Sequence, residues 1–116
     1  MVNPMKIAST RLIRLGLTVL ALGSAMPALA DQALQLGVTD KGFDPTELTG
    51  PAGQRMKIEV TNRTSAAIEF ESFELNRERV IQPGQTVSVY VSGLDAGRYE
   101  FFDDFNTARR GVLVLQ

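Results

Sequence analysis

Apolar and polar residues alternate along most of the chain after residue 31. The alternating or apolar segments lie at residues 32–39, 47–49, 55–62, 67–72, 86–91, 98–104 and 112–115. Because the side chains of a strand point alternately to its two faces, each alternating segment is predicted to be a strand with one buried face. Turn residues separate the segments, and we find no apolar stripe of helical period long enough for a helix. The pattern predicts an all-β, mainly antiparallel sandwich or partly closed barrel of about seven strands.

The C-terminal segment 98–116 is predicted to form strand, loop and strand, with Gly111 restarting the apolar strand at 112–115. Alternation places Tyr99, Phe101 and Asp103 on one face of the first strand and Glu100, Phe102 and Asp104 on the other. The inward row therefore ends on a carboxylate, which is costly to bury without a partner. We expect Asp103 at the rim of the fold, within reach of a cation or water.

A second informative stretch runs from residue 67 to residue 75. Ile68 and Phe70 are predicted to face inward, and Glu69 and Glu71 outward. Phe73 breaks this alternation, so a bulge or the end of the strand is predicted near Ser72. Residues 40–45 and 76–79 are predicted to be turns. Met56 lies on the apolar face of its own strand, so we expect it to pack in the core rather than bind a metal.

The first thirty residues show the pattern of a signal peptide. Lys6, Arg11 and Arg14 form a basic region, and the apolar run 15–26 is too short to span a bilayer. The small residues Ala28 and Ala30, on either side of Leu29, form a small-x-small cleavage site. We predict a signal peptide at 1–30, a single domain at 31–116 and a periplasmic location without membrane insertion after processing. An uncleaved anchor is the alternative.

Charge and composition narrow the chemistry of the predicted domain. Without the three basic residues of the leader, the chain has nine basic and thirteen acidic residues, a net charge of −4. This charge argues against nucleic acid or anionic membranes as partners and favours a metal cation. The chain contains no Cys and no His. Ser–His and Cys–His catalysis and Cys/His zinc or copper sites are therefore excluded, and we do not expect an enzyme.

The order of the motifs carries a family resemblance. The motifs are Phe43-x-Pro45, Met56-x-Ile58-x-Val60-x-Asn62, Glu69-Phe70-Glu71, Pro83-Gly84, Leu94-x-x-Gly97-x-Tyr99-x-Phe101 and Gly111-x-Leu113-x-Leu115. The set resembles the cupredoxin Greek-key fold and, more closely, the EfeO-type cupredoxin-like domains of bacterial ferrous-iron uptake systems. The resemblance implies a periplasmic protein that handles iron or copper together with an inner-membrane iron permease or another periplasmic protein.

The chain departs from the blue-copper members of that family at their metal ligands. In those members a Cys follows the Tyr-x-Phe-x strand, and a His and a Met lie in the next loop. Here Asp103 occupies the Cys position, and the segment 104–110 has neither His nor Met. A type 1 copper centre requires the thiolate, so the protein is not expected to be a blue-copper electron carrier.

Two interpretations of the acidic residues remain open. The first is a hard-cation site with the oxygen ligands Glu69, Glu71, Asp103 and Asp104, which suit ferric iron, manganese or calcium. The second is a metal-free binding or assembly module whose rim loops contact another protein. In that case the acids are solvated or paired with Arg77, Arg79, Arg109 and Arg110. The aromatic residues 99, 101, 102 and 105 are expected to serve packing rather than to line a ligand pocket.

Overall fold

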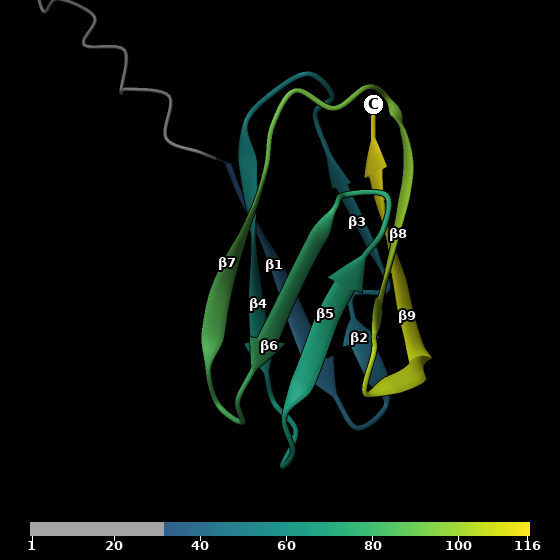
Figure 1. The fold of residues 1–116 in the computed structure, drawn as a ribbon. Helices are drawn as coiled ribbons and strands as arrows, with labels where there is room; N and C mark the ends of the chain where they lie inside the picture. The colour runs from purple at the N-terminus through teal and green to yellow at the C-terminus, as the bar shows by residue number, and fades with distance from the viewer. Residues whose placement is uncertain (1–31) are drawn as a thin grey trace, which may run out of the picture. The chain divides into compact units, whose positions relative to one another are not determined.

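A computed structural model describes residues 32–116, which form nine strands in two packed sheets (Figure 1). The strands are β1 (Gln32–Thr39), β2 (Gly42–Asp44), β3 (Glu47–Gly50), β4 (Met56–Asn62), β5 (Ile68–Ser72), β6 (Arg77–Ile81), β7 (Thr86–Val91), β8 (Gly97–Asp103) and β9 (Asn106–Leu115). Within this part of the chain, no helix is long and apolar enough to cross a membrane. The predicted signal peptide at 1–30 lies outside the described residues.

Each sheet mixes antiparallel and parallel pairs. The first sheet, sheet A, has the order β2-β1-β4-β7, and its β1 and β4 are parallel. The second sheet, sheet B, has the order β3-β9-β8-β5-β6, and its β3 and β9 are parallel. The remaining pairs are antiparallel. The prediction of an all-β sandwich is confirmed, and the short strand predicted at 47–49 is present as β3, which is an edge strand of sheet B. The strand number is higher than predicted because β2 and β6 form in segments that were expected to be turns.

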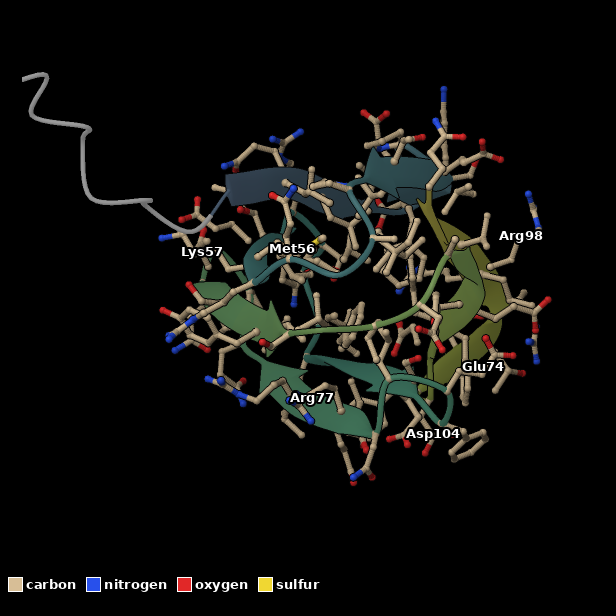
Figure 2. The ribbon with its side chains drawn as sticks, turned by 90° about the horizontal axis from the view of Figure 1, so that it is seen from above. Met56, Lys57, Glu74, Arg77, Arg98 and Asp104 are labelled. Carbon is tan, nitrogen blue, oxygen red and sulfur yellow. The ribbon has the colours of Figure 1, made fainter. Side chains whose placement is uncertain are left out.

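The core lies between the inner faces of the two sheets. Phe101 is at its centre, with the ring of Phe70 stacked against it at 5.3 Å and the ring of Phe43 meeting it edge-on at 4.9 Å. Met56 is 1% exposed, which confirms its predicted place in the core. Figure 2 shows Met56 between the sheets and the next residue, Lys57, outside them, as the alternation of a strand requires.

The free edges of the two sheets are linked by arginine side chains. Arg77 of β6 donates from Nε to the carbonyl oxygen of Tyr90 (2.9 Å), and Arg79 donates from Nη1 to that of Ser88 (3.2 Å). Both acceptors lie on β7, the edge strand of sheet A. An edge strand exposes unpaired backbone groups, so these bonds cover part of both edges. The charged segment 77–79 is extended rather than a turn because it pairs with β5.

Candidate functional site

The turn between β8 and β9 is far shorter than the predicted loop. β8 ends at Asp103 and β9 begins at Asn106, so that the turn contains only Asp104 and Phe105. The pairing register shifts here: Phe102 pairs with Arg110, whereas Asp103 pairs with Asn106. The start of β9 therefore has extra residues opposite β8, and this irregularity accompanies the contact between Arg109 and Asp103.

Asp103 lies inside the sandwich and not at a solvent-accessible rim, so this expectation was wrong. Asp103 is 0% exposed, and it is the cross-strand partner of Phe70 on the inner face of sheet B. Oδ1 accepts hydrogen bonds from the backbone N–H groups of Glu69 and Phe105, both at 3.0 Å. Oδ2 accepts from Nη1 of Arg109 at 3.1 Å. The burial of the carboxylate is possible because an opposite charge and two backbone donors compensate its lost hydration.

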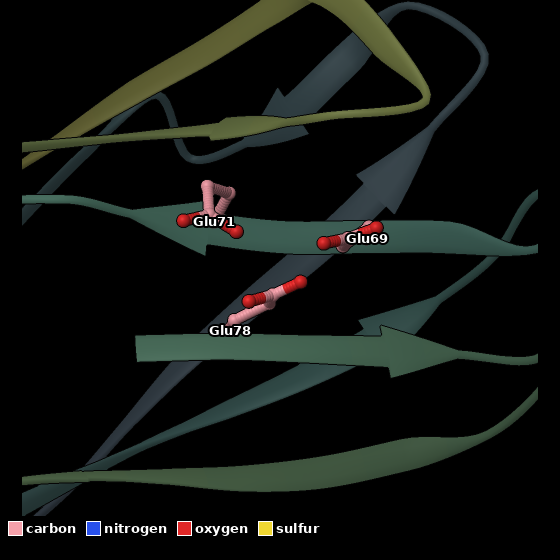
Figure 3. Close-up of side chains that lie close together, drawn as sticks. All are labelled: Glu69, Glu71 and Glu78. Atoms are coloured by element: carbon pink, nitrogen blue, oxygen red, sulfur yellow. The ribbon is translucent and has the colours of Figure 1, made fainter. Parts of the chain in front are cut away.

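Three glutamates gather on the outer face of sheet B. Figure 3 shows Glu69 and Glu71 on β5 and Glu78 reaching toward them from β6. One carboxylate oxygen of each lies within 4.8 Å of those of the other two. Glu71 and Glu78 are direct cross-strand partners, and Glu69 lies two residues from Glu71 on the same face. We call Glu69, Glu71 and Glu78 the glutamate cluster.

Sequence reasoning missed Glu78. It was assigned to a charged turn because Arg77, Glu78 and Arg79 are consecutive charged residues with no apolar residue between them. The polarity of this segment gives no period-two signal for a strand. Only the pairing of β6 with β5 places Glu78 opposite Glu71.

The cluster perturbs the pKa values of its members. A hydrogen bond with Glu78, burial, and the charges of Glu78, Asp104 and Glu71 raise the pKa of Glu69 to about 7. Burial is the largest cause that raises the pKa of Glu71, followed by the charges of Glu78 and Asp104. Crowded carboxylates resist ionising together because each charge destabilises the others. The cluster thus holds a proton near neutral pH, and a metal cation would relieve the same repulsion.

Asp104 lies beside the cluster. It is exposed, its backbone N–H donates to the carbonyl oxygen of Glu69 (2.9 Å), and its charge raises the pKa of both Glu69 and Glu71. Of the four predicted ligands, the structure therefore brings Glu69 and Glu71 together and places Asp104 next to them. It directs Asp103 to the opposite face of the same sheet. Asp103 is the last residue of β8 and faces inward, whereas Asp104 lies in the exposed turn that follows it.

The arginines that were candidate partners of these acids are engaged elsewhere. Arg77 and Arg79 bind β7 carbonyl oxygens, Arg109 binds Asp103, and the guanidinium of Arg110 lies over the ring of Phe102 at 5.2 Å. Among residues 32–116, no lysine or arginine forms a salt bridge with a member of the glutamate cluster or with Asp104. The cluster is a set of closely spaced oxygen donors with uncompensated charge, a donor type that hard cations prefer.

The aromatic residues of β8 divide between the two faces. Phe101 is in the core, and Tyr99 packs against the core while its hydroxyl donates to the carbonyl oxygen of Asp95 at 2.7 Å. The packing prediction is confirmed for these two residues. Phe102 lies on the outer face, where it borders a pocket, and Phe105 is exposed in the turn.

Comparison with known proteins identifies the family. The sequence profile of the Cupredoxin-like domain matches residues 12–115. The chain belongs to the cupredoxin-like family. An uncharacterized protein of Rickettsia prowazekii is 30% identical over 88 residues, which cover 72% of this chain and 70% of that protein.

Solved cupredoxins share the fold of this cupredoxin-like domain. Auracyanin A, a "blue" copper protein from Chloroflexus aurantiacus, matches with a TM-score of 0.63 and 17% identity, over 75% of this chain and all of that one (100%). The metal binding domain of the Cu(I) exporting P-type ATPase CopA of Streptococcus pneumoniae matches with a TM-score of 0.62 and 17% identity, over 72% and 84% of the chains. A purple cupredoxin from Nitrosopumilus maritimus matches with a TM-score of 0.57 and 16% identity, over 72% of this chain and 99% of that one.

The residues of this chain do not fit a type 1 copper ion. The chain has no cysteine and no histidine, and Asp103, which the family resemblance places at the position of the copper-binding cysteine, is fully buried and bound to Arg109. A type 1 site requires a thiolate and imidazole ligands. This cupredoxin-like domain is therefore related to copper-binding proteins but lacks the ligands for their blue-copper chemistry.

Proposed function

We propose that this cupredoxin-like domain is a periplasmic metal-handling protein that binds a hard cation through carboxylates and is an accessory to iron uptake. The observation that carries the proposal is the glutamate cluster, whose ligand atoms lie within 4.8 Å of one another without a basic partner among residues 32–116. Glu69, Glu71 and Glu78 supply the ligands in this proposal. Asp104 adds negative charge beside them.

The choice of cation follows from the donor atoms. Carboxylate oxygens favour hard cations such as ferric iron, manganese or calcium, and they give little selectivity for copper. Iron is our preferred cargo because the sequence motifs resemble those of EfeO-type iron-uptake domains. The leader pattern at 1–30 supports export to the periplasm. An inner-membrane iron permease, or another periplasmic protein, is then the partner that receives the metal.

The test is a metal titration of the purified protein, followed by native mass spectrometry and calorimetry, with ferric iron kept soluble as its citrate complex. We expect a stoichiometric complex that weakens about tenfold or more in Glu78→Gln, because one charged ligand is lost. Glu59→Gln is the matched control, since Glu59 lies on sheet A and is already paired with Lys57 at 3.1 Å. Equal affinity in the two variants would remove the site from the glutamate cluster.

The second candidate function is a metal-free binding or assembly module. It is favoured by Asp103, because a buried Asp–Arg pair stands where the family resemblance implies the copper-binding cysteine of blue-copper members. If the protein binds none of iron, manganese, calcium or copper at micromolar concentration in chelator-treated buffer, this second function replaces the first.

A further inference from the structure

The outer faces of the two sheets differ in whether their polar side chains have hydrogen-bond or ion-pair partners. On sheet A, Glu59 accepts a hydrogen bond from Gln35 (2.9 Å) and pairs with Lys57, and the hydroxyl groups of Thr61 and Thr86 bind each other at 2.8 Å. On sheet B, the glutamate cluster has no basic partner among the described residues. The outer face of sheet B therefore carries negative charge that no basic side chain among the described residues compensates.

The same face of sheet B carries an aromatic pocket. It has a volume of about 210 Å³ and is lined by Phe73, Glu74, Glu100, Phe102 and Arg110. Phe73 is 77% exposed, and its ring lies 5.4 Å from that of Phe102. A large, exposed aromatic side chain beside a pocket is typical of binding surfaces, because it offers apolar area at a small cost in conformational entropy.

The pocket adjoins the glutamate cluster. Phe102 is the direct cross-strand partner of Glu71, and Glu71 is that of Glu78, so the three side chains form one row across β8, β5 and β6. Glu74 and Glu100 add negative charge at the pocket, and Arg110 is the cation that lines it. The row thus combines an apolar pocket with an acidic neighbourhood.

We propose that this row on the outer face of sheet B docks a basic segment of a partner protein, with an apolar side chain in the Phe73–Phe102 pocket and lysine or arginine side chains against the acids. Charge complementarity selects this occupant. Nucleic acid and anionic membranes are repelled by the acids. A second copy bound through the same face would set the same carboxylates against each other.

The test is a titration, followed by NMR, of isotope-labelled protein with a short blocked peptide that alternates lysine with leucine, in buffer that contains EDTA. The protein is purified as it is expressed, and mass spectrometry identifies its N-terminus. We expect saturable amide shifts on β5, β6 and β8. We also expect binding to weaken about fivefold or more in Phe73→Ser, because an exposed aromatic anchor is lost. Tyr90→Ser is the control, since Tyr90 is an exposed aromatic residue of sheet A. A peptide with glutamate in place of lysine should not bind.

Other outcomes would overturn the docking proposal. One is that the amide shifts spread over sheet A, and another is that Phe73→Ser and Tyr90→Ser lose the same peptide affinity. A third is that the protein self-associates and Phe73→Ser abolishes the self-association, which would make a second copy the occupant. The result is independent of the proposed metal function. Phe73→Ser should leave metal affinity unchanged, and the peptide titration is run without free metal, so either proposal can fail while the other stands.

Discussion

The buried pair of Asp103 and Arg109 supports a quantitative prediction. Asp103→Asn keeps the shape of the side chain but removes its charge, which leaves the guanidinium of Arg109 without its buried partner. Breaking a buried pair in this way costs about 3–5 kcal/mol. The side chain of Arg109 is 16% exposed and has Asp40 at 4.0 Å, so we take the lower end, about 3 kcal/mol. At about 4–8 °C per kcal/mol for a domain of this size, the midpoint of thermal unfolding should fall by about 12–24 °C.

The assay is urea unfolding, monitored by far-ultraviolet circular dichroism. Arg109→Met should also be destabilising, and the double variant should lose about 2 kcal/mol less than the sum of the single variants. Glu47→Gln is the control, because Glu47 forms an exposed pair with Arg98 at 3.9 Å and should cost about 0.5 kcal/mol or less. A loss below about 1 kcal/mol for Asp103→Asn, or additive losses in the double variant, would refute the reasoning.

Two further predictions concern stability. Gly111→Ala should cost about 1–3 kcal/mol in urea unfolding, because the added Cβ would lie 2.4 Å from the Phe101 ring and 3.0 Å from the Thr46 carbonyl oxygen; wild-type stability would contradict this packing. The second prediction is that the free energy of unfolding in EDTA falls as pH rises from 4.5 to about 7. The pKa of Glu69 is raised in the folded state, so its contribution is complete at low pH and is lost as the folded protein ionises. The pKa of Glu59 is lowered in the folded state, so its effect on the free energy of unfolding changes only below pH 4.5, outside that window. Glu69→Gln should flatten the slope, and a slope of opposite sign would refute the assignment.

The alternation of residues predicted the faces of the strands well. Met56 was assigned to the core and is buried there, and Phe101 and Asp103 share the inner face of β8 as predicted. The end of β5 at Ser72 explains why Phe73 breaks the alternation. These features depend on local period, which a single strand carries in its own sequence.

The partners of the strands were predicted less well. The edge strand β6 was expected to be a turn, because four of its five residues are exposed and their polarity resembles that of a loop. The residues 106–110 were assigned to a loop for a similar reason, although they extend β9. An edge strand is recognised by its hydrogen bonds to a neighbour, and these bonds are not encoded in the polarity of its side chains.

The sequence by itself determined the all-β class, the faces of the main strands and the absence of the sulfur and imidazole ligands that type 1 copper requires. The tertiary structure alone decided which carboxylates meet. It paired β6 with β5 and thereby brought Glu78 to Glu71, and it directed Asp103 to Arg109 inside the sandwich. The physical reason is that side-chain alternation is local, whereas strand order and register are set by packing between segments distant in the chain.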